Sequence, residues 1–187
     1  LFAAISWLDA GYLSIEDTVK LTSARGKFMN EVAEKVNGGM AAIIGLDSDK
    51  IVEELKKVDG VVEAVNFNEP KQTVIAGEKD AIAKACEILK EAGARRAMPL
   101  AVSGPFHSSL MKEAGEKLKE EAEKYNFTMT DIKLVANTTA NILTSVDEVK
   151  DEIYRQSFGP VKWVDTIKKL KSEGVTTIYE IGFSRTY

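Results

Sequence analysis

The only histidine of the chain lies in a segment that must turn. The segment runs Val102-Ser103-Gly104-Pro105-Phe106-His107-Ser108. Proline lacks the N–H that a helix or strand would use, so its Gly-Pro pair bends the backbone. An imidazole titrates near neutral pH, so His107 could serve as a general base. A loop histidine bonded only to nearby backbone would look the same, and this segment alone leaves both interpretations open.

Two other side chains could complete such a site. Arg25 lies inside a predicted helix beside Gly26, where another backbone or a ligand can approach, and a guanidinium binds carboxylates with paired N–H groups. A surface ion pair is the alternative for this arginine. Gln156 comes shortly before the helix-breaking pair Gly159-Pro160, so its backbone carbonyl is free to orient an imidazole. An ordinary helix end would explain Gln156 as well.

A pair of asparagines forms a third candidate feature. Asn66 and Asn68 flank Phe67 at the end of a predicted strand, where their amides could bind a polar ligand. Local turn chemistry before Pro70 is the alternative, because asparagine side chains readily bond the backbone of turns.

Several other chemistries are excluded by the residues available. One histidine and one cysteine cannot assemble a zinc site, and no close cluster of carboxylates occurs, so we expect no metal. Neither of the common glycine-rich phosphate loops is found. Cys86 falls on the apolar face of a predicted helix, which favours a buried structural thiol over a nucleophile.

The elements that must position these residues fall into two groups. The first group has the order β-α-β-β-α-β, which is typical of a ferredoxin-like lobe. This group ends at the His107 loop. Its predicted elements are strand 40–45, helix 48–58, strands 61–67 and 72–76, helix 78–91 and strand 94–102. The second group alternates helices with strands, as in a parallel sheet covered by helices. Its predicted elements are helices 14–36 and 109–125, strand 132–136, helices 146–156 and 161–172, and strand 175–181.

These elements predict an α/β fold with a ferredoxin-like small lobe (βαββαβ) inserted in a larger body. We expect residues 1–37 to be the helical part of the large subdomain, 38–102 the small subdomain, and 103–187 the remainder of the large one. Residues 1–10 predict a short apolar helix that ends at Gly11, without the charged start of a signal peptide.

The composition is that of an ordinary globular protein. Of the 187 residues 44% are hydrophobic and 29% charged, and the net charge is −4. Basic residues are dispersed among acidic ones, which argues against nucleic-acid or membrane partners. A single cysteine rules out an internal disulfide and suits a cytoplasmic location.

Nine short strings, in one order along the chain, resemble bacterial malonyl-CoA:acyl carrier protein transacylases of type II fatty-acid synthesis. The resemblance extends from about Gly11 to Gly182. The strings are Arg25-Gly26-Lys27-Phe28-Met29-Asn30, Met40-Ala41-Ala42-Ile43-Ile44-Gly45-Leu46-Asp47, Val65-Asn66-Phe67-Asn68, Gln72-Thr73-Val74-Ile75-Ala76-Gly77, Val102-Ser103-Gly104-Pro105-Phe106-His107-Ser108, Leu110-Met111-Lys112, Arg155-Gln156, Pro160-Val161-Lys162-Trp163 and Tyr179-Glu180-Ile181-Gly182.

The resemblance implies a two-step malonyl transfer on an α/β-hydrolase-like body. A serine takes the malonyl group from malonyl-CoA and passes it to the phosphopantetheine thiol of acyl carrier protein. By the same resemblance His107 is the base, Arg25 binds the malonyl carboxylate, and the Gln156 carbonyl holds the imidazole. Asn66 and Asn68 face the active-site gorge. No permanently bound cofactor is implied, and we expect a cytoplasmic monomer.

The chain departs from the family pattern at both ends. The Gly-His-Ser-x-Gly elbow that carries the nucleophile does not occur, nor does the glutamine loop that completes the oxyanion hole. Residues 183–187 replace a glycine-rich finish. We therefore expect the 187 residues to belong to a longer chain and to transfer little malonyl by themselves. The alternative is a non-catalytic module that binds acyl carrier protein or a CoA-like ligand.

Overall fold

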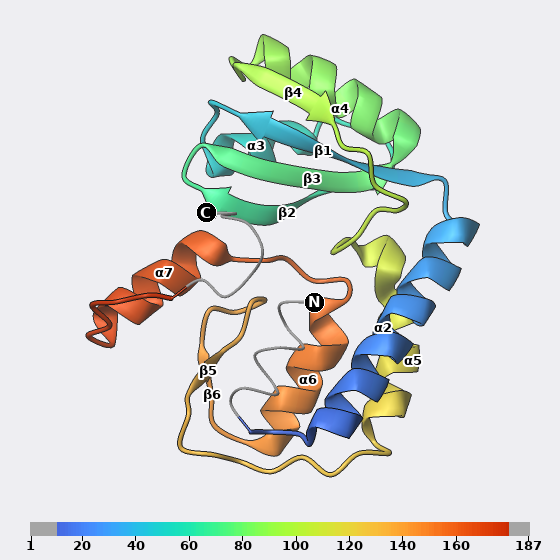
Figure 1. Ribbon diagram of the computed structural model, residues 1–187. Coiled ribbons are helices and arrows are strands. Elements are labelled where there is room, and N and C mark those ends of the chain that lie inside the picture. The colour runs from blue at the N-terminus through green and yellow to red at the C-terminus, as the bar shows by residue number, and fades with distance from the viewer. Residues whose placement is uncertain (1–10, 180–187) are drawn as a thin grey trace.

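The computed structural model describes residues 11–179, which form a four-stranded sheet unit and a helical unit (Figure 1). The helix predicted over 1–10 and the altered finish at 183–187 lie outside the described residues. The sheet unit is at the top of the view, and helices α2, α5 and α6 run together below it. No helix among the described residues is long and apolar enough to span a membrane.

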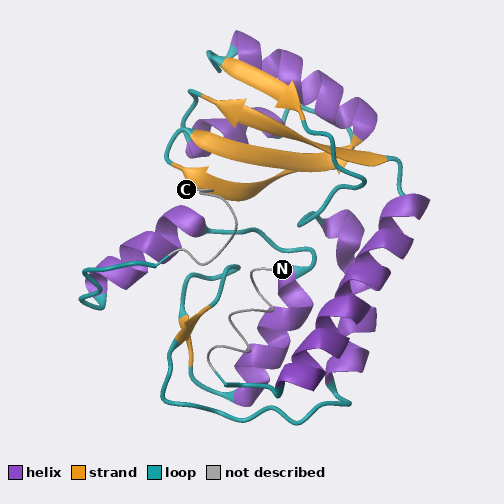
Figure 2. Ribbon diagram, viewed as in Figure 1, coloured by secondary structure: helices purple, strands orange, loops and turns teal. Residues whose placement is uncertain are grey.

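The sheet unit has the predicted β-α-β-β-α-β order. Its elements are β1 (Gly38–Ile44), α3 (Ser48–Leu55), β2 (Val62–Glu69), β3 (Gln72–Glu78), α4 (Lys79–Glu91) and β4 (Arg96–Pro99). The strands lie in the order β2-β3-β1-β4, and all neighbours are antiparallel. Helices α3 and α4 cover one face of this sheet (Figure 2).

One apolar core holds the sheet against its two helices. Ile43 of β1 and Ile75 of β3 are fully buried, and they pack with Ile51 of α3 and Leu89 of α4. Burying a side chain of this size stabilises the fold by about 1.5–3 kcal/mol. Cys86 lies in the same core as a free buried thiol, which confirms the structural interpretation.

The helical unit comprises four helices, a 3₁₀ turn and a short ribbon among the described residues. They are α2 (Ile15–Lys35), η1 (Ser109–Met111), α5 (Lys112–Ala122), β5 (Leu134–Val135), β6 (Ile142–Leu143), α6 (Val146–Gln156) and α7 (Trp163–Ser172). The N-cap of helix α2 is Ser14, whose side chain accepts the Asp17 N–H at 3.1 Å. The inward faces of α2, α5 and α6 meet at Leu21, Leu118 and Ile153.

Three strand predictions are wrong or too long. The last strand of the sheet unit was expected over 94–102, but β4 stops at Pro99 because a local turn follows, with the Val102 N–H bonded to the Leu100 carbonyl. The strand expected over 132–136 shrinks to β5, which pairs antiparallel with β6 instead of joining a parallel sheet. Residues 175–179 form no strand, and the rest of that predicted element lies outside the described residues.

The failure at 175–179 has a physical reason. A strand exists only where a neighbouring strand pairs with its backbone, and within residues 11–179 none lies beside this segment. Its β-forming side chains are left in solvent: Ile178 is 57% and Tyr179 84% exposed. β-propensity describes a fit to an existing sheet and cannot create one.

Candidate active site

The His107 loop is held in a strained conformation by short-range contacts. His107 has φ +64°, a left-handed conformation that residues other than glycine seldom adopt. The buried Ser108 stabilises the turn, because its hydroxyl donates to the Pro105 carbonyl at 2.6 Å. Gly104 lets the loop approach α2, since a Cβ there would lie 2.5 Å from that of Ala33. Strain stabilised by its surroundings is common at functional sites.

The imidazole of His107 is bonded to the end of α6. Its Nδ1–H donates to the Gln156 carbonyl at 2.9 Å, although the two residues are 49 positions apart. Pro160 explains why that carbonyl is available: it stands four residues after Gln156, where a helix would supply an N–H, and proline has none. The bond fixes the tautomer and leaves the Nε2 lone pair as the proton acceptor.

Arg25 reaches the same residue from α2. Its Nη2–H donates to the Gln156 side-chain oxygen at 3.1 Å, and its Nε–H is buried without a hydrogen-bond partner. Within residues 11–179 no carboxylate lies within ion-pairing distance of this guanidinium. Burial lowers the pKa of Arg25, but arginine remains charged at neutral pH. The site thus contains an unneutralised cation with donors to spare.

The charge state of His107 follows from this environment. Burial, and secondly the positive charge of Arg25, lower the pKa of His107 from 6.5 to about 4, against the raising effect of the Gln156 and Gly159 carbonyls. The imidazole is therefore neutral at pH 7 and able to accept a proton.

Strand β2 supports the site from the sheet unit. Its Val65 carbonyl accepts the Val161 N–H at 2.7 Å, and its Phe67 N–H donates to the Val161 carbonyl at 2.9 Å. Asn66 lies between these two bonds and forms an isolated bridge with Val161, five residues beyond Gln156. Asn68 follows two residues later in β2, so both asparagines belong to the strand and not to a turn. In the described part of the chain, no hydrogen bond joins either asparagine side chain to Arg25, His107 or Gln156.

Sequence analysis did not identify the carboxylate of Glu63, which caps the segment after His107. Ser108 is the N-cap of η1, but its side chain makes no cap bond. Instead Glu63 of β2 accepts the Ser109 N–H at 2.9 Å and the Ser109 hydroxyl at 2.5 Å. No local pattern links residues 46 positions apart, so this tie between the two units could not be read from the sequence.

A second carboxylate, Glu152, was also missed. It is 8% exposed and accepts the backbone N–H groups of Asn137 and Thr138 at 2.8 and 3.2 Å, together with the Thr138 hydroxyl. Burial raises its pKa. Its position on α6 was a usable signal, because a charged residue at 152 shares the inward face with Val149 and Gln156.

The structure therefore brings Arg25, Gln156 and His107 together, and it places both asparagines on β2, whose link to this region is the bridge between Asn66 and Val161. The arrangement offers a neutral base with a fixed tautomer next to a cation that can receive a carboxylate. No group of three or more potential metal ligands occurs among residues 11–179.

Comparison with known proteins agrees with this chemistry. The model of the acyl transferase domain family matches residues 4–186. Malonyl CoA-acyl carrier protein transacylase of Bacillus subtilis (strain 168) is 42% identical over 176 residues, which cover 92% of this chain and 56% of the relative. The chain thus spans little more than half the length of the curated relatives that it matches.

Solved structures give the same result. MCAT from Streptococcus pneumoniae superposes with a TM-score of 0.92 at 36% identity, covering 98% of this chain and 60% of that one. A malonyl-transacylase in complex with its type II PKS acyl-carrier protein superposes with a TM-score of 0.89 at 38% identity, covering 92% and 57%. Fold, sequence and site chemistry agree: the chain belongs to the acyl transferase domain family.

Proposed function

We propose that this chain takes part in moving a malonyl group from malonyl-CoA to the phosphopantetheine thiol of acyl carrier protein, in fatty-acid biosynthesis. The observation that carries the proposal is the bonded series from Arg25 through Gln156 to His107. Among residues 11–179 this cation has no carboxylate partner, and its position next to a neutral imidazole suits a substrate with a free carboxylate and an acyl group to transfer. The transacylase names of the relatives support the same assignment.

Each residue has a role in this proposal. His107 removes the proton from the attacking serine hydroxyl and gives it to the departing CoA thiolate. It then removes the proton from the incoming phosphopantetheine thiol and returns it to the serine oxygen when the malonyl group leaves. The Gln156 carbonyl keeps the imidazole in the reactive tautomer. Arg25 pairs with the malonyl carboxylate, and Asn66 and Asn68 bind polar parts of the donor. The 187 residues contain no Gly-His-Ser-x-Gly elbow. The proposal therefore requires a nucleophilic serine that lies outside these 187 residues.

We also propose that the fold is divided into a small and a large subdomain. The sheet order β2-β3-β1-β4 supports a ferredoxin-like small subdomain over 38–102. Residues 1–37 and 103–187 would then belong to an α/β-hydrolase-like large subdomain. We further propose a cytoplasmic monomer that uses malonyl-CoA as substrate and acyl carrier protein as partner, with no permanently bound cofactor and neither nucleic acid nor membrane as partner.

Intact mass spectrometry of the natural gene product tests the proposal. Incubation with malonyl-CoA should add one malonyl group, on a serine, and subsequent addition of holo acyl carrier protein should remove it. Substituting His107→Ala should slow acylation by about 10²–10⁴-fold, the usual contribution of a general base. His107 is the only histidine of the 187 residues, so none of the other residues among them can supply an imidazole in its place.

Two outcomes would contradict the proposal. Near-normal acylation by the His107→Ala variant would exclude this residue as the base. No adduct on the wild-type protein, combined with retained binding of acyl carrier protein or CoA, would favour the non-catalytic binding module.

A further inference from the structure

The side chain of Gln156 makes a contact that its backbone role does not require. The backbone carbonyl accepts the His107 Nδ1–H, whereas the side-chain oxygen accepts the Arg25 Nη2–H at 3.1 Å. Gln156 is 6% exposed, so both bonds lie in a water-poor environment. Arg25 has no other hydrogen bond in the described part of the chain, and its buried Nε–H has no acceptor. Among the described residues, the side-chain amide of Gln156 is therefore the group that orients the Arg25 guanidinium.

We propose that the Gln156 side chain is a specificity-determining positioning residue, which aims Arg25 at the carboxylate of a dicarboxylic acyl thioester without neutralising it. This inference rests on the proposed function of the site. It assigns to the side chain a task separate from that of the backbone carbonyl.

The physical reason lies in the neutrality of the amide. A mobile arginine side chain must lose rotamer freedom to bind a ligand, and a hydrogen bond already formed in the free protein removes part of that cost. A carboxylate at position 156 would fix Arg25 equally well, but its charge would cancel the cation and repel a second carboxylate. An aliphatic side chain at position 156 would leave the charge of Arg25 intact, but it would not orient the guanidinium. Only a neutral acceptor of this length provides both orientation and free charge.

The two roles of Gln156 can be separated experimentally. Every residue type except proline offers the same backbone groups, so a substitution changes the bond to Arg25 and keeps the carbonyl that holds His107. Gln156→Met preserves length and removes the acceptor. Gln156→Glu preserves the acceptor and adds a negative charge.

The experiment measures kcat/KM of the natural gene product with malonyl-CoA and with acetyl-CoA. We expect Gln156→Met to lower the malonyl-to-acetyl ratio about tenfold, the value of one hydrogen bond to a charged group. Gln156→Glu should lower the ratio about 100-fold, because it also cancels the cation. Gln72→Met provides the matched control: Gln72 is the only other glutamine, begins β3, and should leave the ratio unchanged.

A double variant distinguishes positioning from general damage. In an Arg25→Leu background Gln156→Met should cause no further fall in the ratio, because the side chain acts only through Arg25. An additive fall, or an unchanged ratio in both single variants, would overturn the inference. The proposed function fails separately: in that case the wild-type protein itself would show no malonyl transfer.

Discussion

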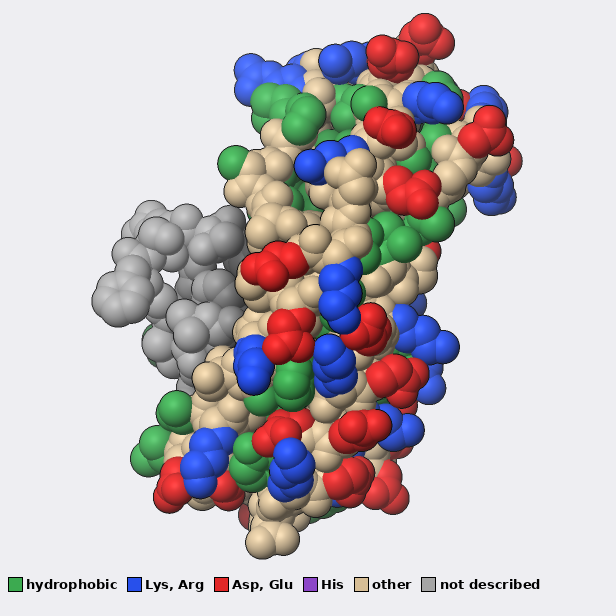
Figure 3. All heavy atoms as spheres, turned by 90° about the vertical axis from the view of Figure 1, so that its right-hand side faces the viewer, with side chains coloured by type: hydrophobic (Ala, Val, Ile, Leu, Met, Phe, Trp, Pro, Cys, Tyr) green, Lys and Arg blue, Asp and Glu red, His purple; other side chains and the backbone are tan. Residues whose placement is uncertain are grey.

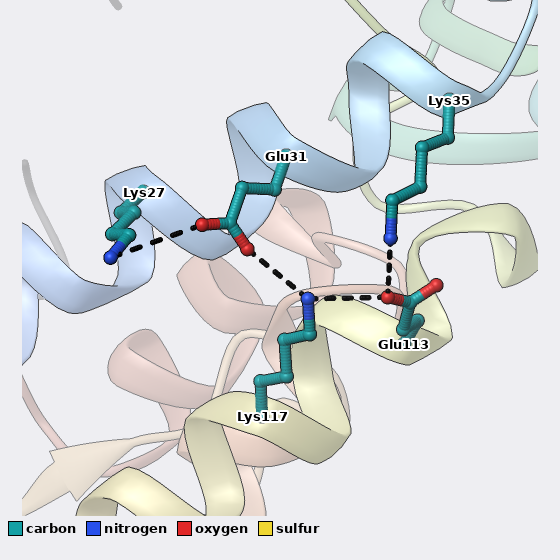
Figure 4. Close-up of polar contacts among 5 residues, drawn as sticks. All are labelled: Lys27, Glu31, Lys35, Glu113 and Lys117. Atoms are coloured by element: carbon teal, nitrogen blue, oxygen red, sulfur yellow. Dashed lines mark hydrogen bonds and ion pairs between the residues drawn. The ribbon is translucent and has the colours of Figure 1, made fainter.

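Two of the cations on helix α2, Arg25 and Lys27, are two residues apart and lie in opposite surroundings. Lys27 is on the surface, with 72% of its side chain exposed, and Arg25 is turned into the site. Lys27 begins an ion-pair network between α2 and α5 in which every cation meets a carboxylate (Figure 4). The network consists of Lys27–Glu31 at 4.0 Å, Glu31–Lys117 at 3.1 Å, Lys117–Glu113 at 3.2 Å and Glu113–Lys35 at 3.0 Å. Within residues 11–179, Arg25 bonds only the neutral side-chain oxygen of Gln156.

The buried Glu152 and the half-buried Arg25 differ in their surroundings from the exposed charges of the helical unit. Glu152, like Arg25, has no charged partner among the described residues and is held by N–H and O–H dipoles. On the surface, positive and negative side chains are intermixed (Figure 3). Exposed pairs are screened by water and salt and contribute little. A buried charge held only by dipoles keeps its field, which is useful only if a ligand or a fixed loop responds to it.

The largest test of this contrast compares Arg25→Leu with Lys27→Leu. Arg25→Leu should lower the malonyl-to-acetyl ratio of kcat/KM by about 100-fold or more, because it removes a desolvated charge-assisted contact. Lys27→Leu changes the same helix two residues later and should leave the ratio within about twofold, as expected of a screened surface charge. Equal losses in the two variants would mean that α2 affects donor choice through its packing and not through the Arg25 charge.

Sequence patterns located the local parts of this arrangement. Helix α6 begins and ends where the apolar spacing and the Gly159-Pro160 pair predict, at Val146 and Gln156. The sheet unit follows the predicted element order because each of its strands pairs with a neighbour inside the same stretch of chain. Patterns of this kind depend on residues close in sequence, which is why they can be read without a structure.

The resemblance predicted the bond between the Gln156 carbonyl and His107, but two other long-range contacts of the site were not predicted. Arg25 and Gln156 are 131 positions apart, and nothing in either neighbourhood specifies the other. Arg25 and Gln156 were each singled out for their chemistry, but the use of the glutamine side chain depends on how α2 packs against the end of α6. The same is true of Glu63, whose capping of Ser109 requires β2 to lie against the His107 segment.

A second test follows stability as a function of pH. The unpaired charge of Arg25 helps to lower the pKa of His107, whereas Lys27, which is paired with Glu31, should have no such effect. The folded-state pKa of His107, about 4, lies below its ordinary value of 6.5. The unfolded chain therefore binds this proton more readily, and stability is lost as the pH falls from 6.5 toward 4. The loss attributable to His107 should be roughly 2–3 kcal/mol in the free energy of unfolding.

Nuclear magnetic resonance titration of the His107 imidazole measures its pKa directly. Arg25→Leu should raise the pKa of His107, because a positive neighbour disappears, whereas Lys27→Leu should leave it in place. A wild-type pKa near the ordinary value, or no response to Arg25→Leu, would show that the guanidinium charge does not reach the base.

The smallest expected effect concerns the centre of the surface network. Lys117 pairs with both Glu31 and Glu113, yet its side chain is 34% exposed, so Lys117→Ala should cost less than about 1 kcal/mol in the free energy of unfolding. The cost should shrink further in high salt, because exposed ion pairs are screened. Denaturant unfolding at two ionic strengths measures both quantities. A loss above about 2 kcal/mol in the free energy of unfolding that does not depend on salt would contradict this prediction. It would mean that the network behaves as a buried one, because only desolvated ion pairs cost that much when one partner is removed.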